Sequence, residues 1–197
     1  MLLQFSCSNH KSIKDEITFS MVASKDSTNA DTLRKLNNVR VVRVASIYGA
    51  NGSGKSNFVD AIGFARNLIV NSLSHPPGSR LIQFPHKLSN VSDSSKYEFQ
   101  FAVEDIRYVY GFSIKNGIID DEYFYYFPNN KKIKVFERIG MKIIPGNRYK
   151  SSFTLSKEVL KENRLFLACA ANYSRIAEIE KAFIFFSRDL VLYSACI

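Results

Sequence analysis

The sequence has few of the residues that build covalent or metal-linked frameworks. It contains three cysteines, Cys7, Cys169 and Cys196, and three histidines, none of them in a C-x-x-C or H-E-x-x-H pattern. An odd number of cysteines without paired spacing argues against a disulfide framework and against a zinc site. We therefore interpret the cysteines as buried thiols, and any metal chemistry must come with a bound nucleotide.

Long apolar runs and targeting signals are also absent from the sequence. No run approaches the roughly 18 to 20 residues of a membrane span. The N-terminal stretch MLLQFSCSNHKSIKDE becomes charged too early for a signal peptide and has no small-residue cleavage site. These observations predict a cytoplasmic protein that does not contact a membrane.

The overall composition is that of a folded domain. The chain has 197 residues, of which 46% are hydrophobic and 23% charged, and its net charge is +9. A chain of this length can bury a substantial core. We therefore expect residues 1–197 to form a single domain, either one large domain or part of a bigger one.

The first part of the chain shows strand, loop and helix patterns in turn. Residues 1–23 contain two segments of alternating polarity around a polar turn, which predicts a β-hairpin. Polar residues predict a loop over 24–38. The β-branched run over 41–48 predicts a buried strand, and apolar residues at helical spacing predict a helix over 55–71.

The remainder of the chain is mainly strand and then helix. Alternating apolar residues separated by turn signals predict an antiparallel β-meander over 96–138. A helical pattern returns over 156–186. The expected fold class is therefore α/β (α+β), a strand-loop-helix core with an antiparallel β-meander and C-terminal helices.

One motif carries specific chemistry. Residues 49–56 fit the pattern G-x-x-x-x-G-K-[ST] at every fixed position, between the expected strand and the expected helix. Glycines let backbone N–H groups turn toward phosphate oxygens, the lysine supplies a charge to the β and γ phosphates, and the serine hydroxyl binds Mg²⁺. The pattern predicts an ATP and Mg²⁺ site, with Ser56 as the metal ligand. Its residues are Gly49, Ala50, Asn51, Gly52, Ser53, Gly54, Lys55 and Ser56.

The surroundings of this loop indicate its class. A guanine-binding N-K-x-D motif is missing, because Asn130-Lys131-Lys132-Ile133 lacks the aspartate. No lid or acceptor signature of a small-molecule kinase follows the loop. An antiparallel hairpin before the loop and an antiparallel meander after its helix resemble the ATP-binding head of the ABC class.

Further motifs extend the resemblance over nearly the whole chain. The segments 5–13 and 47–57 resemble the opening of SMC, RecF and OLD-like ATPases, and the chain is most similar to AAA-type ATP-binding proteins of bacterial phage-defence and abortive-infection loci. The motifs Tyr108-x-Tyr110-Gly111-Phe112 and Glu122-x-x-x-Tyr126 also look like that family. The resemblance implies ATP held between two heads, hence a homodimer or a partner subunit. It also implies nucleotide contacts from Asn57 and from the turn residues Asn9, Lys11 and Ser12, although that turn could equally be a solvated hairpin end.

The acidic motif that an ATPase of this class needs is not evident. Residues 118–122 end in Asp-Asp-Glu but follow Asn-Gly, which favours a hairpin strand, and residues 182–186 are followed by Ser-Arg-Asp. No Ser-Gly signature segment is present, and neither Gln83 nor Gln100 can be assigned as the glutamine that senses the γ phosphate. We assign no catalytic residue. The simplest interpretation is the N-terminal lobe of a longer ATPase, which alone binds ATP and turns it over poorly.

Two surface features have competing interpretations. Residues 131–150 contain seven basic side chains and one acid, so they could follow a nucleic-acid backbone, although a solvated, lysine-protected hairpin edge is favoured. The aromatic run 123–127 is more typical of sheet packing than of base stacking. The leading hypothesis is an ABC/SMC-like ATP-binding lobe of a defence or DNA-maintenance system. Its rival is a non-catalytic, nucleotide-dependent module that binds protein or nucleic acid.

Overall fold

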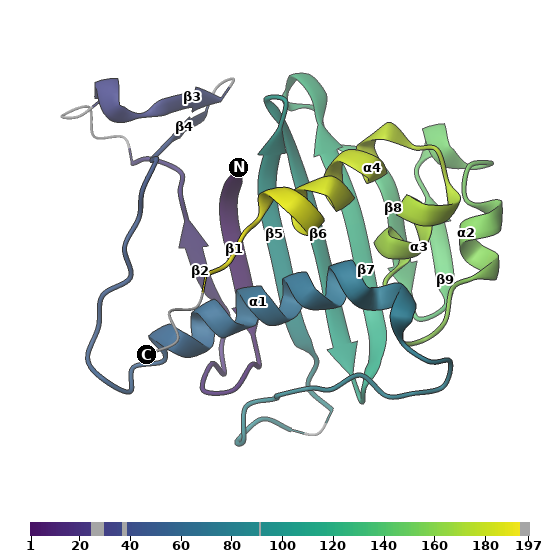
Figure 1. The fold of residues 1–197 in the computed structure, drawn as a ribbon, viewed down its shortest axis with the longest axis horizontal. Helices are drawn as coiled ribbons and strands as arrows, with labels where there is room; N and C mark the ends of the chain where they lie inside the picture. The colour runs from purple at the N-terminus through teal and green to yellow at the C-terminus, as the bar shows by residue number, and fades with distance from the viewer. Residues whose placement is uncertain (25–29, 37–38, 91, 194–197) are drawn as a thin grey trace.

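A seven-stranded antiparallel sheet organises the molecule. The computed structural model describes residues 1–24, 30–36, 39–90 and 92–193. The strand order is β2-β1-β5-β6-β7-β8-β9, and every neighbouring pair is antiparallel (Figure 1). The strands are β1 (Leu2–Ser8), β2 (Ile17–Ser20), β5 (Ser95–Val103), β6 (Ile106–Lys115), β7 (Ile118–Phe127), β8 (Ile133–Ile139) and β9 (Lys142–Pro145).

The helices cover one face of this sheet and leave the other face open (Figure 1). The predicted helix over 55–71 is confirmed as α1 (Lys55–Asn71), which packs on the sheet through its apolar stripe, with the rings of Phe5 and Phe58 5.5 Å apart. The remaining helices are α2 (Thr154–Glu158), α3 (Phe166–Tyr173), α4 (Ala177–Ile184), the π-helical turn η5 (Phe185–Asp189), and the 3₁₀ turns η1 (Ala30–Thr32), η2 (Ser72–Ser74), η3 (Pro128–Asn130) and η4 (Asn147–Tyr149).

Two sheet predictions agree with the structure. The hairpin predicted over 1–23 is β1 paired with β2, and the meander predicted over 96–138 is β5 to β8. In the meander, alternate aromatic side chains point under the helices. The ring of Phe101 stacks on that of Phe185 at 4.3 Å, and the ring of Phe99 meets that of Phe186 at 5.1 Å.

The helical region after the meander is more broken than its pattern suggests. The predicted segment 156–186 is divided into α2, α3 and α4. Between α2 and α3 the side chain of Asn163 turns inward and donates to the carbonyl groups of Pro76 and Ser79, at 2.7 and 2.9 Å. These hydrogen bonds fix the segment around Asn163 against the loop 76–79, where it forms no helix.

The buried strand predicted over 41–48 is wrong for most of its length. Only its first residue lies in a strand, because β4 (Val39–Val41) pairs with β3 (Arg34–Leu36), which lies in the described part of the loop predicted over 24–38. Residues 42–48 form no strand, and Val44 and Tyr48 are 79% and 89% exposed. A β-branched run becomes a buried strand only where a neighbour takes its backbone hydrogen bonds. Among the described residues no strand lies alongside 42–48.

A buried ion pair joins the meander to α3. Glu122 and Arg138 have fully buried side chains 3.3 Å apart. The Glu122 carboxylate also accepts the backbone N–H groups of Phe166 and Leu167, at 2.6 and 2.8 Å, and the hydroxyl of Tyr110 at 2.9 Å. Burial raises the pKa of Glu122, and Arg138 with the two backbone donors works against that shift. The carboxylate therefore caps α3 from inside the sheet.

The same pair corrects the interpretation of the basic stretch 131–150. Arg138 is 1% exposed, so it cannot contact an external phosphate backbone. Lys134 is 2.8 Å from Glu137, and Lys132 lies over the ring of Tyr125. These three cations are engaged within the sheet.

The remaining observations concern the cysteines and membrane contact. Cys7 and Cys169 are buried, as predicted, and burial raises the pKa of each thiol to about 12. Cys196 lies outside the described residues. No helix in the described part of the chain has both the length and the apolarity to cross a membrane.

Replacing Arg138 by methionine should be strongly destabilising. The change leaves Glu122 buried without its cation, and breaking a buried pair in this way costs about 3–5 kcal/mol. Urea unfolding monitored by circular dichroism measures the loss. The double variant Arg138→Met with Glu122→Gln should recover part of it, and a double variant less stable than Arg138→Met would contradict the assignment.

Candidate functional site

The loop 49–54 has the backbone shape that the motif requires. Gly52 and Gly54 have φ angles of +80° and +94°, a region that side chains with a Cβ rarely adopt. Gly54 is the N-cap of α1 and makes no side-chain cap. The helix therefore begins with backbone N–H groups that no side chain satisfies, which is the arrangement that binds phosphate.

Lys55 lies at the mouth of this loop. Its ammonium group donates to the carbonyl oxygens of Gly49 and Ala50, at 2.6 and 2.7 Å. The lysine thus folds back over the turn and places its charge inside it. A triphosphate chain in the turn would meet this charge together with the N–H groups at the helix start, so the donor set fits a polyphosphate anion.

An apolar hollow of about 250 Å³ adjoins the loop. Its walls come from β2, the segment before the loop and the first turns of α1. The lining residues are Ile17, Thr18, Phe19, Ile47, Tyr48, Ser53, Gly54, Lys55 and Phe58. The hollow therefore combines apolar and aromatic walls with the ammonium-bearing side chain of Lys55.

The turn between β1 and β2 packs against the loop. The Ser12 hydroxyl accepts a hydrogen bond from the Asn57 side-chain amide at 2.7 Å, and a Cβ built on Gly54 would lie 3.1 Å from that hydroxyl. Lys11 is 2.7 Å from Asp60 on α1. Asn9 is 3% exposed, and its side chain binds the loop at His86 and Asp93. The structure thus places Ser12 and Asn57 beside the loop. The side chain of Lys11 contacts α1 through Asp60, and the side chain of Asn9 is buried.

His10 is a residue of this region that sequence reasoning missed. Its side chain is fully buried, with Nδ1 2.8 Å from the Tyr97 hydroxyl and Nε2 2.9 Å from the Asp60 carboxylate. It therefore connects β5 to the helix that follows the phosphate loop. A single histidine in a polar turn gives no sequence signal for such a link, because both partners are distant along the chain.

The environment of this cluster lowers the pKa values of both His10 and Asp60. Burial lowers the pKa of His10, and its hydrogen bond to Asp60 only partly opposes that shift. For Asp60, burial raises the pKa, but Lys11 and His10 outweigh it and the net shift is downward. A neutral imidazole between a hydroxyl and a carboxylate can donate to one and accept from the other.

The other candidates from the sequence lie away from the loop. Gln83 uses its amide within the protein, since it donates to the carbonyl of Ile114 and accepts the N–H of Gly117, at 2.9 and 2.8 Å. Residues 118–122 belong to the hairpin strand β7, as predicted, and residues 182–186 are helical. Neither acidic stretch ends a buried parallel strand beside the loop.

The protein should lose stability as the pH is lowered, because of the titration of His10. Because its folded pKa is lowered, the unfolded state binds the proton more readily, and stability present above the unfolded pKa near 6.5 is lost as pH falls below it. Urea unfolding between pH 8 and pH 5 should show a slope of up to about 1.4 kcal/mol per pH unit from this group. His10→Gln should remove that part of the slope, whereas the control His75→Gln, at a half-buried histidine outside this cluster, should keep it. Equal slopes for wild type and His10→Gln would refute the assignment.

Comparison with known proteins agrees with the loop and the meander. Residues 44–140 match the model of the family described as "AAA domain, putative AbiEii toxin, Type IV TA system". The matched region contains the segment before the loop, the loop itself, α1 and the strands β5 to β8. No curated protein matches the chain. The family match supports an AAA-type P-loop ATPase-like domain in a toxin or abortive-infection context.

Proposed function

We propose that this chain binds ATP with Mg²⁺ through residues 49–56, as the N-terminal part of an ABC/SMC-like ATPase. The observation that carries the proposal is the complete G-x-x-x-x-G-K-S loop in a turn with two glycines at positive φ, leading into an uncapped helix. These three features meet at one place, and each favours a phosphate chain.

The residues of the loop have distinct roles in this proposal. Lys55, whose ammonium group donates to the carbonyl groups of Gly49 and Ala50 in this structure, would supply the positive charge for the β and γ phosphates. The hydroxyl of Ser56, exposed at the helix start, holds Mg²⁺, which when bound neutralises charge on the phosphate oxygens. Ser12 and Asn57 are hydrogen-bonded to each other beside the loop, and the residues that line the adjoining apolar hollow would offer apolar contacts to a nucleotide base.

The exposed segment 42–48 fits an incomplete lobe. Its β-branched and aromatic side chains, Val44 and Tyr48 among them, are exposed next to a nucleotide loop that needs a rigid support. We infer that a strand from the remainder of the ATPase, or from a partner subunit, pairs with this segment and makes it the buried strand that its composition favours. The acidic residue that activates water would come from the same part.

The biological role follows from the same resemblance. We propose a role in bacterial antiphage defence or DNA maintenance, with ATP controlling the association of two heads in a homodimer or with a partner subunit. Contact of the 131–150 region with nucleic acid remains a weaker proposal, since Lys132, Lys134 and Arg138 are engaged within the sheet.

A non-catalytic nucleotide-dependent module is the second candidate. The observation in its favour is the use of Glu122, the one glutamate of the Asp-Asp-Glu stretch, as a structural cap for α3. A carboxylate tied to a helix start and to Arg138 cannot also polarise water. Turnover measurements separate the two candidates.

Lys55→Ala should weaken the binding of ATP. Removing the ammonium group takes away the cation of the phosphate site, and we expect at least about a tenfold increase in Kd, equal to about 1.4 kcal/mol. Isothermal titration calorimetry with ATP and MgCl₂ measures it. Lys14→Ala, an exposed lysine on the hairpin turn, is the matched control and should bind as wild type does. Failure of the folded wild-type chain to bind would overturn the proposal.

The chain alone should release phosphate from ATP slowly. The reason is that no carboxylate on the described residues is placed at a strand end beside the loop. A coupled phosphate assay under multiple turnover, with Lys55→Ala as the blank, should show rates close to that blank. Rapid turnover that disappears in Lys55→Ala would instead mean that this chain carries its own catalytic acid.

A further inference from the structure

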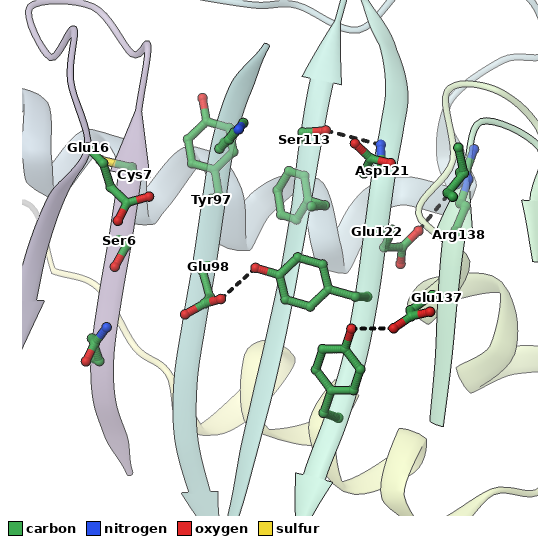
Figure 2. Close-up of a pocket in the computed structure, with 16 residues that line it drawn as sticks. Ser6, Cys7, Glu16, Tyr97, Glu98, Ser113, Asp121, Glu122, Glu137 and Arg138 are labelled. Atoms are coloured by element: carbon green, nitrogen blue, oxygen red, sulfur yellow. Dashed lines mark hydrogen bonds and ion pairs between the residues drawn. The ribbon is translucent and has the colours of Figure 1, made fainter. Parts of the chain in front are cut away.

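The open face of the sheet contains a hollow that the nucleotide site does not use. It has a volume of about 530 Å³ and lies across β1, β5, β6, β7 and β8, on the side away from α1 (Figure 2). The side chains of Glu16, Glu98 and Glu137 lie at different places across this open face (Figure 2). The hollow is separate from the phosphate loop, none of whose residues line it.

The register of the strands explains the hollow. Ser6, Glu98, Gly111, Tyr123 and Glu137 are cross-strand partners in one row across the face. Gly111 has no side chain, and a Cβ there would lie 2.4 Å from the Tyr123 ring. The ring therefore crosses β6 over Gly111, and its hydroxyl donates to Glu98 at 2.6 Å. Small residues form the floor, and tyrosines and carboxylates form the walls.

The face carries two matching pairs of tyrosine and glutamate. Tyr125 donates to Glu137 at 2.6 Å, as Tyr123 does to Glu98, and the two tyrosine rings stack at 5.5 Å. In each pair the phenol points at the carboxylate, so a carboxylate oxygen and an aromatic face lie together. This combination binds ammonium and guanidinium groups.

One of the two pairs already holds lysines of this chain. The Lys132 ammonium lies 3.7 Å from the centre of the Tyr125 ring, and the Lys134 ammonium is 2.8 Å from Glu137. At the other pair, no ion pair or cation–π contact joins Glu98 or Tyr123 to any cation in the described part of the chain. The second oxygen of Glu98 accepts a hydrogen bond from the neutral amide of Gln100 at 3.1 Å, so this pair has polar partners but no cation. The structure thus contains one version of the site with a cation and one without.

The charge around the Tyr123–Glu98 pair favours a cation. Carboxylates of Glu16, Glu98 and Asp121 line the hollow against the exposed cation Lys96, because the lining Glu137 is paired with Lys134 and the lining Arg138 with the buried Glu122. Partial burial and the neighbouring Asp120 raise the pKa of Asp121, and Lys96 does not cancel that shift. Among the described residues no three acidic, His or Cys side chains converge as metal ligands. The carboxylates are spread along the face, which suits several cationic side chains in sequence.

We propose that this hollow is the docking site for a lysine-bearing extended segment of a partner protein, whose ammonium group occupies the Tyr123–Glu98 pair as Lys132 and Lys134 occupy Tyr125–Glu137. A second copy of this chain is the alternative occupant, which the test below distinguishes. The proposal does not depend on nucleotide binding.

A labelled peptide tests the proposal directly. A fluorescein-labelled peptide of alternating lysine and alanine is titrated with the protein, and anisotropy is measured at about 0.15 M salt, where a Debye length of about 8 Å screens the overall positive charge. We expect saturable binding, weakened about three- to tenfold by Glu98→Gln and by Tyr123→Leu. Glu158→Gln, which removes the same charge from the exposed surface of α2, is the matched control and should leave binding unchanged.

Each other outcome contradicts the proposal. Absence of saturable binding, or equal weakening by Glu98→Gln and Glu158→Gln, would show that the hollow does not recognise lysine. Equal affinity for free spermidine would exclude a polypeptide as the specific occupant, and concentration-dependent dimers lost in Glu98→Gln would identify a second copy. Glu98 lies on the open face, so we expect the Glu98→Gln variant to fold, and its unfolding midpoint checks this. The binding test therefore still decides the proposal if Tyr123→Leu does not fold.

Discussion

The buried carboxylate of Glu122 is the interaction on which the rest of the structure depends. It lies in the middle of the meander, yet it accepts the first N–H groups of α3 and pairs with Arg138. Arg138 in turn donates to the carbonyl groups of Gly140, Lys161 and Arg164. One ion pair therefore fixes the sheet, the β8–β9 turn and the segment before α3. An unpaired charge at this depth would be so costly that these parts must form together.

The phosphate loop is positioned from two sides. The apolar stripe of α1 holds the helix against the sheet, which sets the direction of the N–H groups at its start. The turn between β1 and β2 holds the same helix through His10, Lys11 and Ser12. Support from the segment before the loop is weak, because residues 43–48 are exposed and, within the described part of the chain, belong to no strand. The helix, rather than a preceding strand, determines the geometry of the site in this structure.

The two faces of the sheet differ in the side chains that they carry. The aromatic residues of the face under the helices build the core, as the stacked pair Phe101 and Phe185 shows. The opposite face presents tyrosines and carboxylates in cross-strand rows around Gly111. Alternation along the strands therefore separates the face that packs against α1 from the face that carries the tyrosine–glutamate pairs.

The sequence by itself determined the local features of this protein: the first hairpin, the meander, the α1 helix and the glycine-rich turn with Lys55. These depend on short-range patterns of polarity and on glycine at positive φ, which a linear sequence displays. Tertiary structure alone decided that Arg138 is buried, that His10 links Tyr97 to Asp60 and that residues 42–48 form no strand. Each of these outcomes depends on which distant residue comes alongside, and the pattern of a single segment carries no record of its neighbour in space.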